Sequence, residues 1–399
     1  MHPLNMLLQL LFYICICTVE AKVVTFLIGS DTHIGVNSTH GSTAARNSQA
    51  ILEMLKTQGM EWPLQLGTGQ VQPLSGLVLT GDLINDGSDV SKCTSQWNQW
   101  ESVYGMSLRQ DSSLLPIFEG FGNHDGGNTS AEHECNIVRR AVQLRNTLRS
   151  SRIRNISPGT LHYSWDWDEL HLVHLNLYPG EEHEFAQEWM HGSWQYPEYS
   201  RSFLEADLAE NVGDSERPIC IFFHYGFDGY WSQLWWTDHE RALFLETVSK
   251  YNVLAIFVGH THVAMTYQWE GIDIVNSPST VQGNDKGPLP PSFMVAELNF
   301  DSGVFRVAQR EGSGWGAVTL LKNVSKAKGD AALQVDRKKC NGRQHNGAWK
   351  DGSEVFISNS QANLALNKPC SSPDAKILDS AVQEAIKLDN LIERVESYI

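Results

Sequence analysis

Five short runs of almost uninterrupted apolar residues recur along the chain, and polar residues follow each of them. Runs of this length are typical of strands that are buried on both faces, as in parallel sheets covered by helices. Helical segments between such strands give the β-α-β order of a layered α/β fold. The five predicted strands are residues 23–28, 77–80, 115–118, 219–223 and 253–258.

Three segments between the first strands have helical character. Residues 42–57 carry a partial apolar stripe, and residues 84–112 contain a short helix with Trp97 and Trp100. Residues 132–148 form a basic segment, and a solvated face is expected for its arginines. These arginines, with one just beyond the segment, are Arg139, Arg140, Arg145 and Arg149.

From residue 161 the apolar period changes to two, which is typical of antiparallel strands. Residues 161–167 and 170–177 are expected to form a hairpin turned by Asp168 and Glu169. Helices are predicted at 201–211 and 238–250. The later alternating runs suggest a second sheet packed on the first, with strands at about 263–269, 272–276, 293–299, 304–309 and 316–321.

The two ends of the chain differ from this central part. Residues 1–21 are predicted to be a signal peptide, because the run from Leu7 to Cys17 is apolar except at Gln9 and is too short to span a bilayer comfortably. We therefore expect a protein that is secreted or held in the lumen of the secretory pathway, in an extracellular or lysosome-like setting, without a stable membrane span. Residues 326–399 are a C-terminal extension of no assigned fold, with an amphipathic pattern at 379–397.

The net charge and the cysteine content limit the partners and the cellular compartment that we expect. The formal charge of −16 argues against a broad nucleic-acid surface. In an oxidising compartment we expect two disulfides, Cys93–Cys135 and Cys340–Cys370, whereas Cys220 lies in a buried strand as a small apolar residue. Glycosylation sequons occur at Asn37, Asn128, Asn155 and Asn323.

The polar residues after the five strands share one chemistry. They are Asp31-Thr32-His33, Gly81-Asp82, Gly122-Asn123-His124-Asp125, His224 and Gly259-His260-Thr261-His262. The carboxyl ends of such strands are where sites gather in open α/β sheets. Mixed carboxylate, amide and imidazole ligands suit Mn, Fe or Zn better than Ca or Mg. The pattern therefore indicates a metal centre at this edge, and it does not choose among these three metals.

This ordered set of motifs resembles the calcineurin-like metallophosphoesterase superfamily, over residues 22–325. The resemblance implies an α/β fold, a four-layer αββα sandwich of two packed mixed sheets flanked by helices, with two divalent metal ions. The purple acid phosphatase branch has a tyrosine after the second motif's aspartate. Here Leu83 follows Asp82, and the first motif has His33, so a tyrosine-bound ferric site is not expected.

Position by position, the resemblance implies that Asp31, His33 and His262 hold the first metal. It implies that Asn123, His224 and His260 hold the second metal, and that Asp82 bridges the two. The implied reaction is hydrolysis of a small phosphorylated substrate, in which a metal-bridging hydroxide attacks phosphorus in line with the leaving group. His124 would protonate the leaving oxygen or stabilise its charge, and Asp125 would orient His124.

Several readings remain open from the sequence. Hydrolysis of phosphate monoesters and of diesters is equally compatible with the motifs. The alternative to an enzyme is a catalytically inactive phosphoesterase scaffold that acts as an extracellular binding module. Trp231, Trp235 and Trp236 are expected to pack, or else to form a pocket rim that stacks an aromatic leaving group. Possible substrate contacts are Asn37, Tyr225 and Asn276, while surface or packing roles are expected for His162, His171, His174, His183 and His191.

Overall fold

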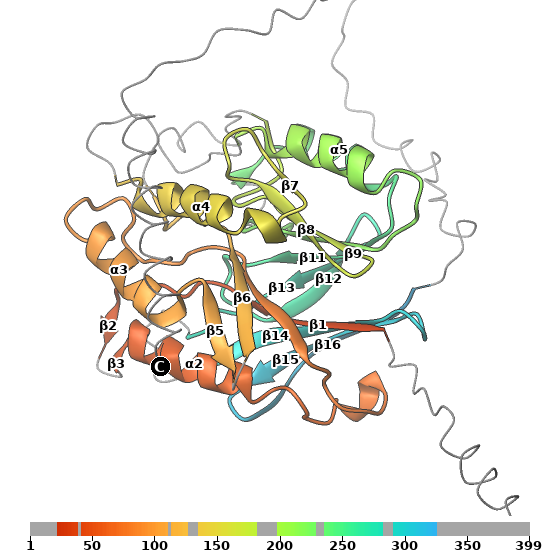
Figure 1. Ribbon diagram of the computed structural model, residues 1–399, viewed down its shortest axis with the longest axis horizontal. Coiled ribbons are helices and arrows are strands. Elements are labelled where there is room, and N and C mark those ends of the chain that lie inside the picture. Colours follow the sequence, from red (N-terminus) through yellow and green to blue (C-terminus); the bar gives the residue numbers. More distant parts are fainter. Residues whose placement is uncertain are drawn as a thin grey trace, which may run out of the picture. The chain divides into compact units, whose positions relative to one another are not determined.

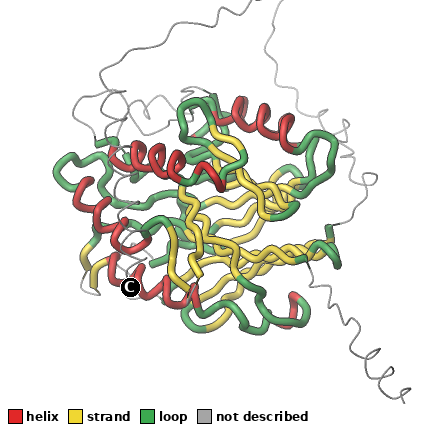
Figure 2. Tube along the Cα trace, in the orientation of Figure 1, coloured by secondary structure: helices red, strands yellow, loops and turns green. Residues whose placement is uncertain are grey.

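The computed structural model describes residues 22–38, 41–110, 113–126, 135–181, 198–228, 235–281 and 290–324 (Figures 1 and 2). The chain divides into two units, Met1–Ala327 and Lys328–Ile399, and every described residue belongs to the first. The predicted signal peptide, the C-terminal extension and the Cys340–Cys370 pair lie outside the described residues.

The first sheet is mixed and has seven strands. Strands β1, β4 and β6 are parallel neighbours, and the remaining neighbours pair antiparallel. Their order is β16(Gly314–Asn323), β15(Val304–Glu311), β14(Ser292–Asn299), β1(Val23–Gly29), β4(Leu74–Leu79), β6(Ser113–Glu119) and β5(Ser107–Gln110).

The second sheet is also mixed and seven-stranded. Strands β13, β11, β10 and β9 are successive parallel neighbours, and antiparallel pairs complete the sheet on both sides. Their order is β12(Met265–Trp269), β13(Ile272–Asn276), β11(Val253–Val258), β10(Ile219–Phe222), β9(Leu170–His174), β8(Tyr163–Trp167) and β7(Asn155–Ile156). A separate two-stranded ribbon joins β2(Asn37–Ser38) to β3(Gly41–Ser42).

An aromatic core joins the two sheets face to face. Phe118 of the first sheet stacks on Trp165 of the second, with ring centroids 4.3 Å apart. Phe26 meets Phe222 edge to face at 6.2 Å. Phe26 contributes to this inner core, whereas its neighbour Leu27 belongs to the core that includes the helices. The central strands are therefore buried on both faces, which explains why their sequences are apolar without alternation.

Helices cover the outer faces of the two sheets, and Figure 2 shows them outside the strands. Figure 1 shows α2 and α5 on opposite sides of the sheets. Phe244 of α7 packs edge to face on Phe223 at the end of β10, with centroids 5.8 Å apart. This is the predicted four-layer αββα arrangement. The described α-helices are α2(Thr43–Leu55), α3(Cys93–Tyr104), α4(Ile137–Leu148), α5(Ser200–Asn211) and α7(Asp238–Val248), with short 3-10 turns at Leu64–Leu66 and Ser150–Arg152.

The predicted placement of the late strands is wrong in one respect. The five runs after residue 262 do form strands, but they do not build one sheet together. β12 and β13 extend the second sheet beside β11, whereas β14, β15 and β16 extend the first sheet beside β1. Alternation along a strand reports which of its faces is buried, and it carries no information about the neighbouring strand.

The expected solvated arginine face is also wrong for two of its members. Arg145 and Arg149 are buried, and both pair with the buried carboxylate of Glu119 in β6. Arg145 Nε lies 2.8 Å from Glu119 Oε1, and Arg149 Nη2 lies 2.6 Å from the same oxygen. A buried cation needs such a partner, and the partner lies in a strand remote from the helical segment that suggested a surface role.

A disulfide links Cys93, the first residue of α3, to Cys135 before α4, as predicted. Cys220 is buried in β10 with a free thiol. Among the described helices, none combines the length and apolar character that crossing a bilayer requires.

Candidate metal centre

Backbone hydrogen bonds join the loops that follow β1 and β4. The N–H of Asp31 donates to Gly81 O and the N–H of His33 donates to Asp82 O, each at 3.0 Å. Because β1 and β4 are parallel neighbours, their carboxyl ends already lie together, and these bonds extend the pairing beyond the strands. The first two motifs therefore face each other in one fixed register.

Left-handed backbone marks most of the predicted ligands. Positive φ angles occur at Asp31 (51°), His33 (41°), Asp82 (51°), His260 (70°) and His262 (62°). Such angles are uncommon for residues other than glycine and are retained where the surroundings over-determine them, often at functional sites. Asp31 and His33 come from one such loop and His262 from another, and all three contribute ligand atoms to the same cluster.

Two acids and two imidazoles from three motifs form the first cluster. His262 Nε2 lies 3.2 Å from Asp31 Oδ1 and 3.0 Å from His33 Nε2. The fully buried Asp31 Oδ1 accepts no hydrogen bond of ordinary geometry from the described residues. Two imidazole nitrogens facing one another beside such an oxygen form a ligand set for a cation. With Asp82, one ligand atom of each residue lies within 4.8 Å of the others.

The second cluster gathers around His224, which follows β10. His224 Nε2 lies 3.0 Å from Asn123 Oδ1, and the nearest ligand atoms of Asp82, His224 and His260 lie within 4.8 Å of one another. His224 Nδ1 faces the Thr80 carbonyl at 3.1 Å. A carbonyl only accepts, so Nδ1 carries the proton in the neutral ring and Nε2 offers its lone pair to the cluster.

Asp82 belongs to both clusters. Its Oδ2 lies 3.6 Å from His33 Nε2 and 3.4 Å from His224 Nε2. Its Oδ1 accepts the backbone N–H of His124 at 2.8 Å, which fixes the orientation of the carboxylate. Gly122 allows this approach, because a Cβ at that position would collide with Asp82 Oδ1.

The two buried carboxylates are kept ionised by positive charge beside them. Burial opposes ionisation of Asp31 and Asp82, but the neighbouring imidazoles of His262 and His224 hold the pKa of each carboxyl well below its usual value. Burial likewise opposes protonation of His224, yet Asp82 raises the pKa of that imidazole to about 9. Burial and the charge of His224 lower the pKa of His260 to about 3.

The donor set fits two divalent cations. Carboxylate, amide and imidazole ligands suit Mn, Fe or Zn, and a carboxylate facing both clusters can offset the repulsion between two ions. The seven predicted ligands lie together at one edge of the two sheets. Asp31, His33 and His262 line one position, Asn123, His224 and His260 line the other, and Asp82 lies between them.

His124 lies beside the two clusters. Its imidazole contacts a backbone carbonyl, whereas the prediction expected a contact with Asp125. Its ring packs edge to face on His33 at 4.7 Å, and its Nδ1 lies 2.8 Å from the carbonyl of Asn85. Burial opposes its protonation, but Asp82 and the Asn85 carbonyl raise its pKa overall. The imidazole is thus oriented by a backbone carbonyl, and a backbone contact of this kind cannot be identified from residue types.

Asp125 instead joins two ligand loops. Its carboxylate accepts the backbone N–H groups of Leu83, Ile84 and Gly122, at 2.7 to 3.0 Å. The expected orientation of His124 by Asp125 is therefore wrong. Burial and the nearby charge of Asp82 raise the pKa of Asp125 to about 7. An aspartate that follows a strand gives no sign in the sequence that its carboxylate will join two loops.

The residues predicted to touch substrate or to form a pocket rim differ in where they lie. Tyr225 is buried and stacks on Trp235 at 4.8 Å, and both rings pack edge to face against His260. Trp236 is buried and donates to Gly226 O. The amide of Asn276 donates to Val263 O at 2.7 Å, and Asn37 is exposed.

Three of the unassigned histidines are buried packing residues: His162, His171 and His174. His171 lies between two carboxylates, with Nδ1 2.7 Å from Asp166 Oδ1 and Nε2 2.7 Å from Asp207 Oδ2. Trp231, His183 and His191 lie outside the described residues.

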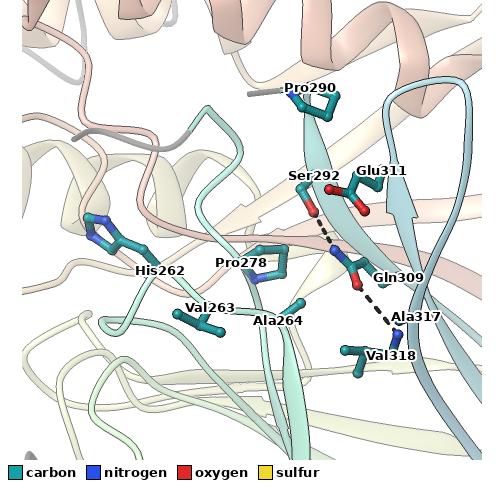
Figure 3. A pocket seen from close by; sticks show the side chains of 10 residues that line it. All are labelled: His262, Val263, Ala264, Pro278, Pro290, Ser292, Gln309, Glu311, Ala317 and Val318. Atoms are coloured by element: carbon teal, nitrogen blue, oxygen red, sulfur yellow. Dashed lines mark hydrogen bonds between the residues drawn. The ribbon is translucent and has the colours of Figure 1, made fainter. Parts of the chain in front are cut away.

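A groove of about 290 Å³ begins behind His262 and runs toward β15 and β16 (Figure 3). Figure 3 shows the His262 ring pointing away from the other lining side chains. Within the groove, Gln309 Nε2 donates to Ser292 Oγ at 3.1 Å, and Gln309 Oε1 accepts the Val318 N–H at 3.4 Å. Of the lining residues, His262 alone also belongs to a metal cluster, and the polar atoms of Ser292, Gln309 and Val318 bond to one another.

Comparisons with known proteins identify a family for the chain and similar solved structures. The family model for calcineurin-like phosphoesterases matches residues 24–264. No curated protein matches the sequence. The structure is similar to GAP50, the anchor in the inner membrane complex of Plasmodium, with 13% identity, a TM-score of 0.45 and coverage of 77% of this chain and 90% of that chain.

Two further solved structures are similar at low identity. Vps29 from Entamoeba histolytica, complexed with zinc, has 11% identity and a TM-score of 0.31, with 76% of this chain and 100% of that chain covered. The phosphopantetheinyl hydrolase of Mycobacterium tuberculosis has 12% identity and a TM-score of 0.32, with 65% of this chain and 91% of that chain covered. The family match spans more than half of the 399 residues and all five strand-end motifs, so the chain belongs to the calcineurin-like phosphoesterase family.

Proposed function

We propose that this protein hydrolyses phosphate esters of small molecules with the help of two divalent cations, Mn, Fe or Zn. The observation that carries the proposal is the position of Asp82. One carboxylate oxygen faces His33 Nε2 at 3.6 Å and His224 Nε2 at 3.4 Å. That arrangement suits a bridging ligand between two cations, and a single cation would not require it.

Two cations, when bound, supply a water of lowered pKa and neutralise phosphoryl charge. The chain's own residues do the rest. Asp31, His33 and His262 hold one position, and Asn123, His224 and His260 hold the other. Asp82, which faces both positions, would serve as their shared ligand.

His124 is the proton donor to the leaving oxygen. Its Nδ1–H donates to the Asn85 carbonyl, so the proton for transfer is carried on Nε2. The charge of Asp82 and the Asn85 carbonyl both favour the protonated ring. General acid catalysis of this kind contributes roughly 10²- to 10⁴-fold to a rate.

The test is turnover of p-nitrophenyl phosphate and of its bis-ester, after chelation and after addition of Mn²⁺, Zn²⁺ or Fe²⁺. Chelation should abolish turnover, and one of the three metals should restore it. The preferred ester distinguishes a monoesterase from a diesterase. His124→Ala should lower turnover of the corresponding phenyl ester by about 100-fold or more while metal content stays unchanged.

Inactivity on both esters with every metal would favour the alternative, a phosphoesterase scaffold that only binds. Loss of metal from His124→Ala would show that His124 is a ligand and not the acid.

We further propose that the protein enters the secretory pathway. The Cys93–Cys135 disulfide supports this, because disulfides persist in oxidising compartments. Asn37 and Asn323 are exposed and available for glycosylation, whereas the Asn155 amide donates to Asp207 Oδ1 at 3.0 Å. Peptide mapping of protein from a secreting host should find glycans at Asn37 and Asn323 and none at Asn155.

A further inference from the structure

We infer that Gln96, on helix α3, is a positioning residue for His124. This inference rests on the proposed role of His124 as the proton donor. Gln96 touches neither the metal ligands nor the His124 ring. It acts through the loop after β4, whose carbonyl at Asn85 holds the imidazole.

The side-chain amide of Gln96 bonds on both of its sides to this loop. Gln96 Oε1 accepts the Asp86 N–H at 2.8 Å and the Asn85 N–H at 3.2 Å, and the latter N–H is shared with Ile34 O. Gln96 Nε2 donates to Asp86 Oδ2 at 2.8 Å. Two of these hydrogen bonds hold the peptide that contains the Asn85 carbonyl and the peptide before it, and the third ties Gln96 to the Asp86 side chain.

The same loop holds His124 at two points. The Asn85 carbonyl lies 2.8 Å from His124 Nδ1, and the Gly87 N–H donates to the His124 carbonyl at 2.8 Å. A tilt of the Asn85 peptide would move the acceptor of Nδ1–H and rotate the ring. The Nε2 proton would then point away from the leaving oxygen.

Gln96 is itself held rigidly. It is buried on α3, and its amide packs on the bare backbone of Gly35, where a Cβ would collide with it. The Cys93–Cys135 disulfide anchors the helix three residues earlier. Gln96 therefore transmits the position of a fixed helix to a loop whose backbone would otherwise be set by fewer bonds.

The experiment measures the dependence of kcat on the leaving group, from dinitrophenyl through nitrophenyl to phenyl esters, in metal-loaded protein. Gln96→Met removes all three hydrogen bonds at similar length. It should slow phenyl ester hydrolysis by about 10- to 100-fold, because phenoxide needs the proton. Dinitrophenyl ester hydrolysis should change less than about threefold, because dinitrophenoxide leaves without one.

Two variants separate positioning from general damage. The double variant Gln96→Glu/Asp86→Asn exchanges donor and acceptor while keeping all three bonds, so it should recover most of the phenyl ester rate. Gln99→Met, at an exposed site on the same helix, should match wild type. Metal content of Gln96→Met should equal that of wild type.

A second readout does not depend on turnover. In zinc-loaded protein at a pH where the His124 ring is neutral, ¹⁵N NMR of the histidines should show the proton of that ring on Nδ1, and Gln96→Met should lose this preference. Equal leaving-group dependence in Gln96→Met and wild type, or no recovery in the double variant, would overturn the inference. A wild type without turnover would overturn the proposed function instead, and the tautomer measurement would still decide the role of Gln96.

Discussion

At the scale of single residues, Asp82 is the ligand on which the candidate metal centre depends most, because one of its oxygens faces both clusters. Asp82→Asn keeps the shape of the side chain and removes its charge. Two cations would then lack a shared anion. We expect bound metal to fall from about two ions per chain to one or fewer, and turnover to fall by about 100-fold or more.

Elemental analysis of the purified variant measures this stoichiometry. Asp89→Asn makes the same change of charge at a half-exposed carboxylate away from the clusters and should keep the full metal content. Two retained ions in Asp82→Asn would contradict a bridging role.

Glu119 is a residue on which stability, and not chemistry, depends. Its carboxylate compensates two buried guanidinium groups, Arg145 and Arg149. Glu119→Gln leaves these cations without an anion, and such a loss typically costs about 3–5 kcal/mol of unfolding free energy. Glu101→Gln is the matched control, because Glu101 is half-exposed and lies 3.8 Å from Arg145, so its loss should cost about 1 kcal/mol or less. Urea unfolding of both variants tests the contrast.

The lowered pKa of the Glu119 carboxyl also predicts that the protein loses stability in acid. Burial raises the pKa of Glu119, but the two arginines outweigh it and lower the pKa from 4.5 to about 2. Because the folded pKa is depressed, its contribution is complete above the unfolded pKa and is lost as pH falls from 4.5 toward about 2. Urea midpoints at pH 5 and pH 3 should therefore differ more in wild type than in Glu119→Gln. Equal differences would contradict this assignment.

At the scale of elements, the sequence identified the strands that carry the ligands and the helices between them. Apolar runs and helical periodicity are local properties, so residues 23–28 and 253–258 were recognisable without a partner. Strand neighbours are not local, and β14 pairs with β1 although more than 260 residues separate them. For this reason the prediction places β14, β15 and β16 in the wrong sheet, whereas β12 and β13 do lie in the second sheet.

The candidate site shows the same division. Ligands of a metal stand in short motifs at strand ends, so Asp31 and His262 could be selected from the sequence. Residues that position other residues carry no such mark. Gln96 lies inside an ordinary helix, and Asn85 contributes only a backbone carbonyl. Their contacts depend on the packing of α3 against the loop after β4, which residue types alone do not reveal.

The disulfide is the covalent link of helix α3, and its removal gives a prediction at this scale. Cys93 and Cys135 are 42 residues apart, and the loop they close contains Asn123 and His124. Cys93→Ser/Cys135→Ser should lower the unfolding free energy by about 2–4 kcal/mol, since a cross-link restricts the unfolded chain. Urea unfolding measures it, with Cys220→Ala as a thiol control. Equal stability of the double variant and wild type would show that the bond is not a stabilising link.

At the scale of the whole molecule, the centre joins the two sheets. Asp82 follows a strand of the first sheet, whereas His224 and His260 follow strands of the second. Cations bound as proposed would therefore stabilise the packing of one sheet on the other. At a metal concentration 100 times the dissociation constant, this amounts to about 2.7 kcal/mol.

Metal removal should accordingly lower the melting temperature by about 5–10 °C. Differential scanning calorimetry before and after chelation gives the shift, and returning the metal should reverse it. Asp82→Asn should melt at a temperature that chelation barely changes. An unchanged melting temperature in wild type would mean that the folded protein does not bind the metal more tightly than the unfolded chain does.

The left-handed backbone of five ligand residues has one more consequence. Each such conformation costs of order 1–3 kcal/mol, which the surrounding fold must absorb. A glycine at Asp31 or Asp82 would relieve that strain while destroying the centre. Selection for stability and selection for catalysis would therefore act in opposite directions at these positions. A relative that is no longer selected for catalysis would be expected to gain stability in its metal-free form as it lost these ligands.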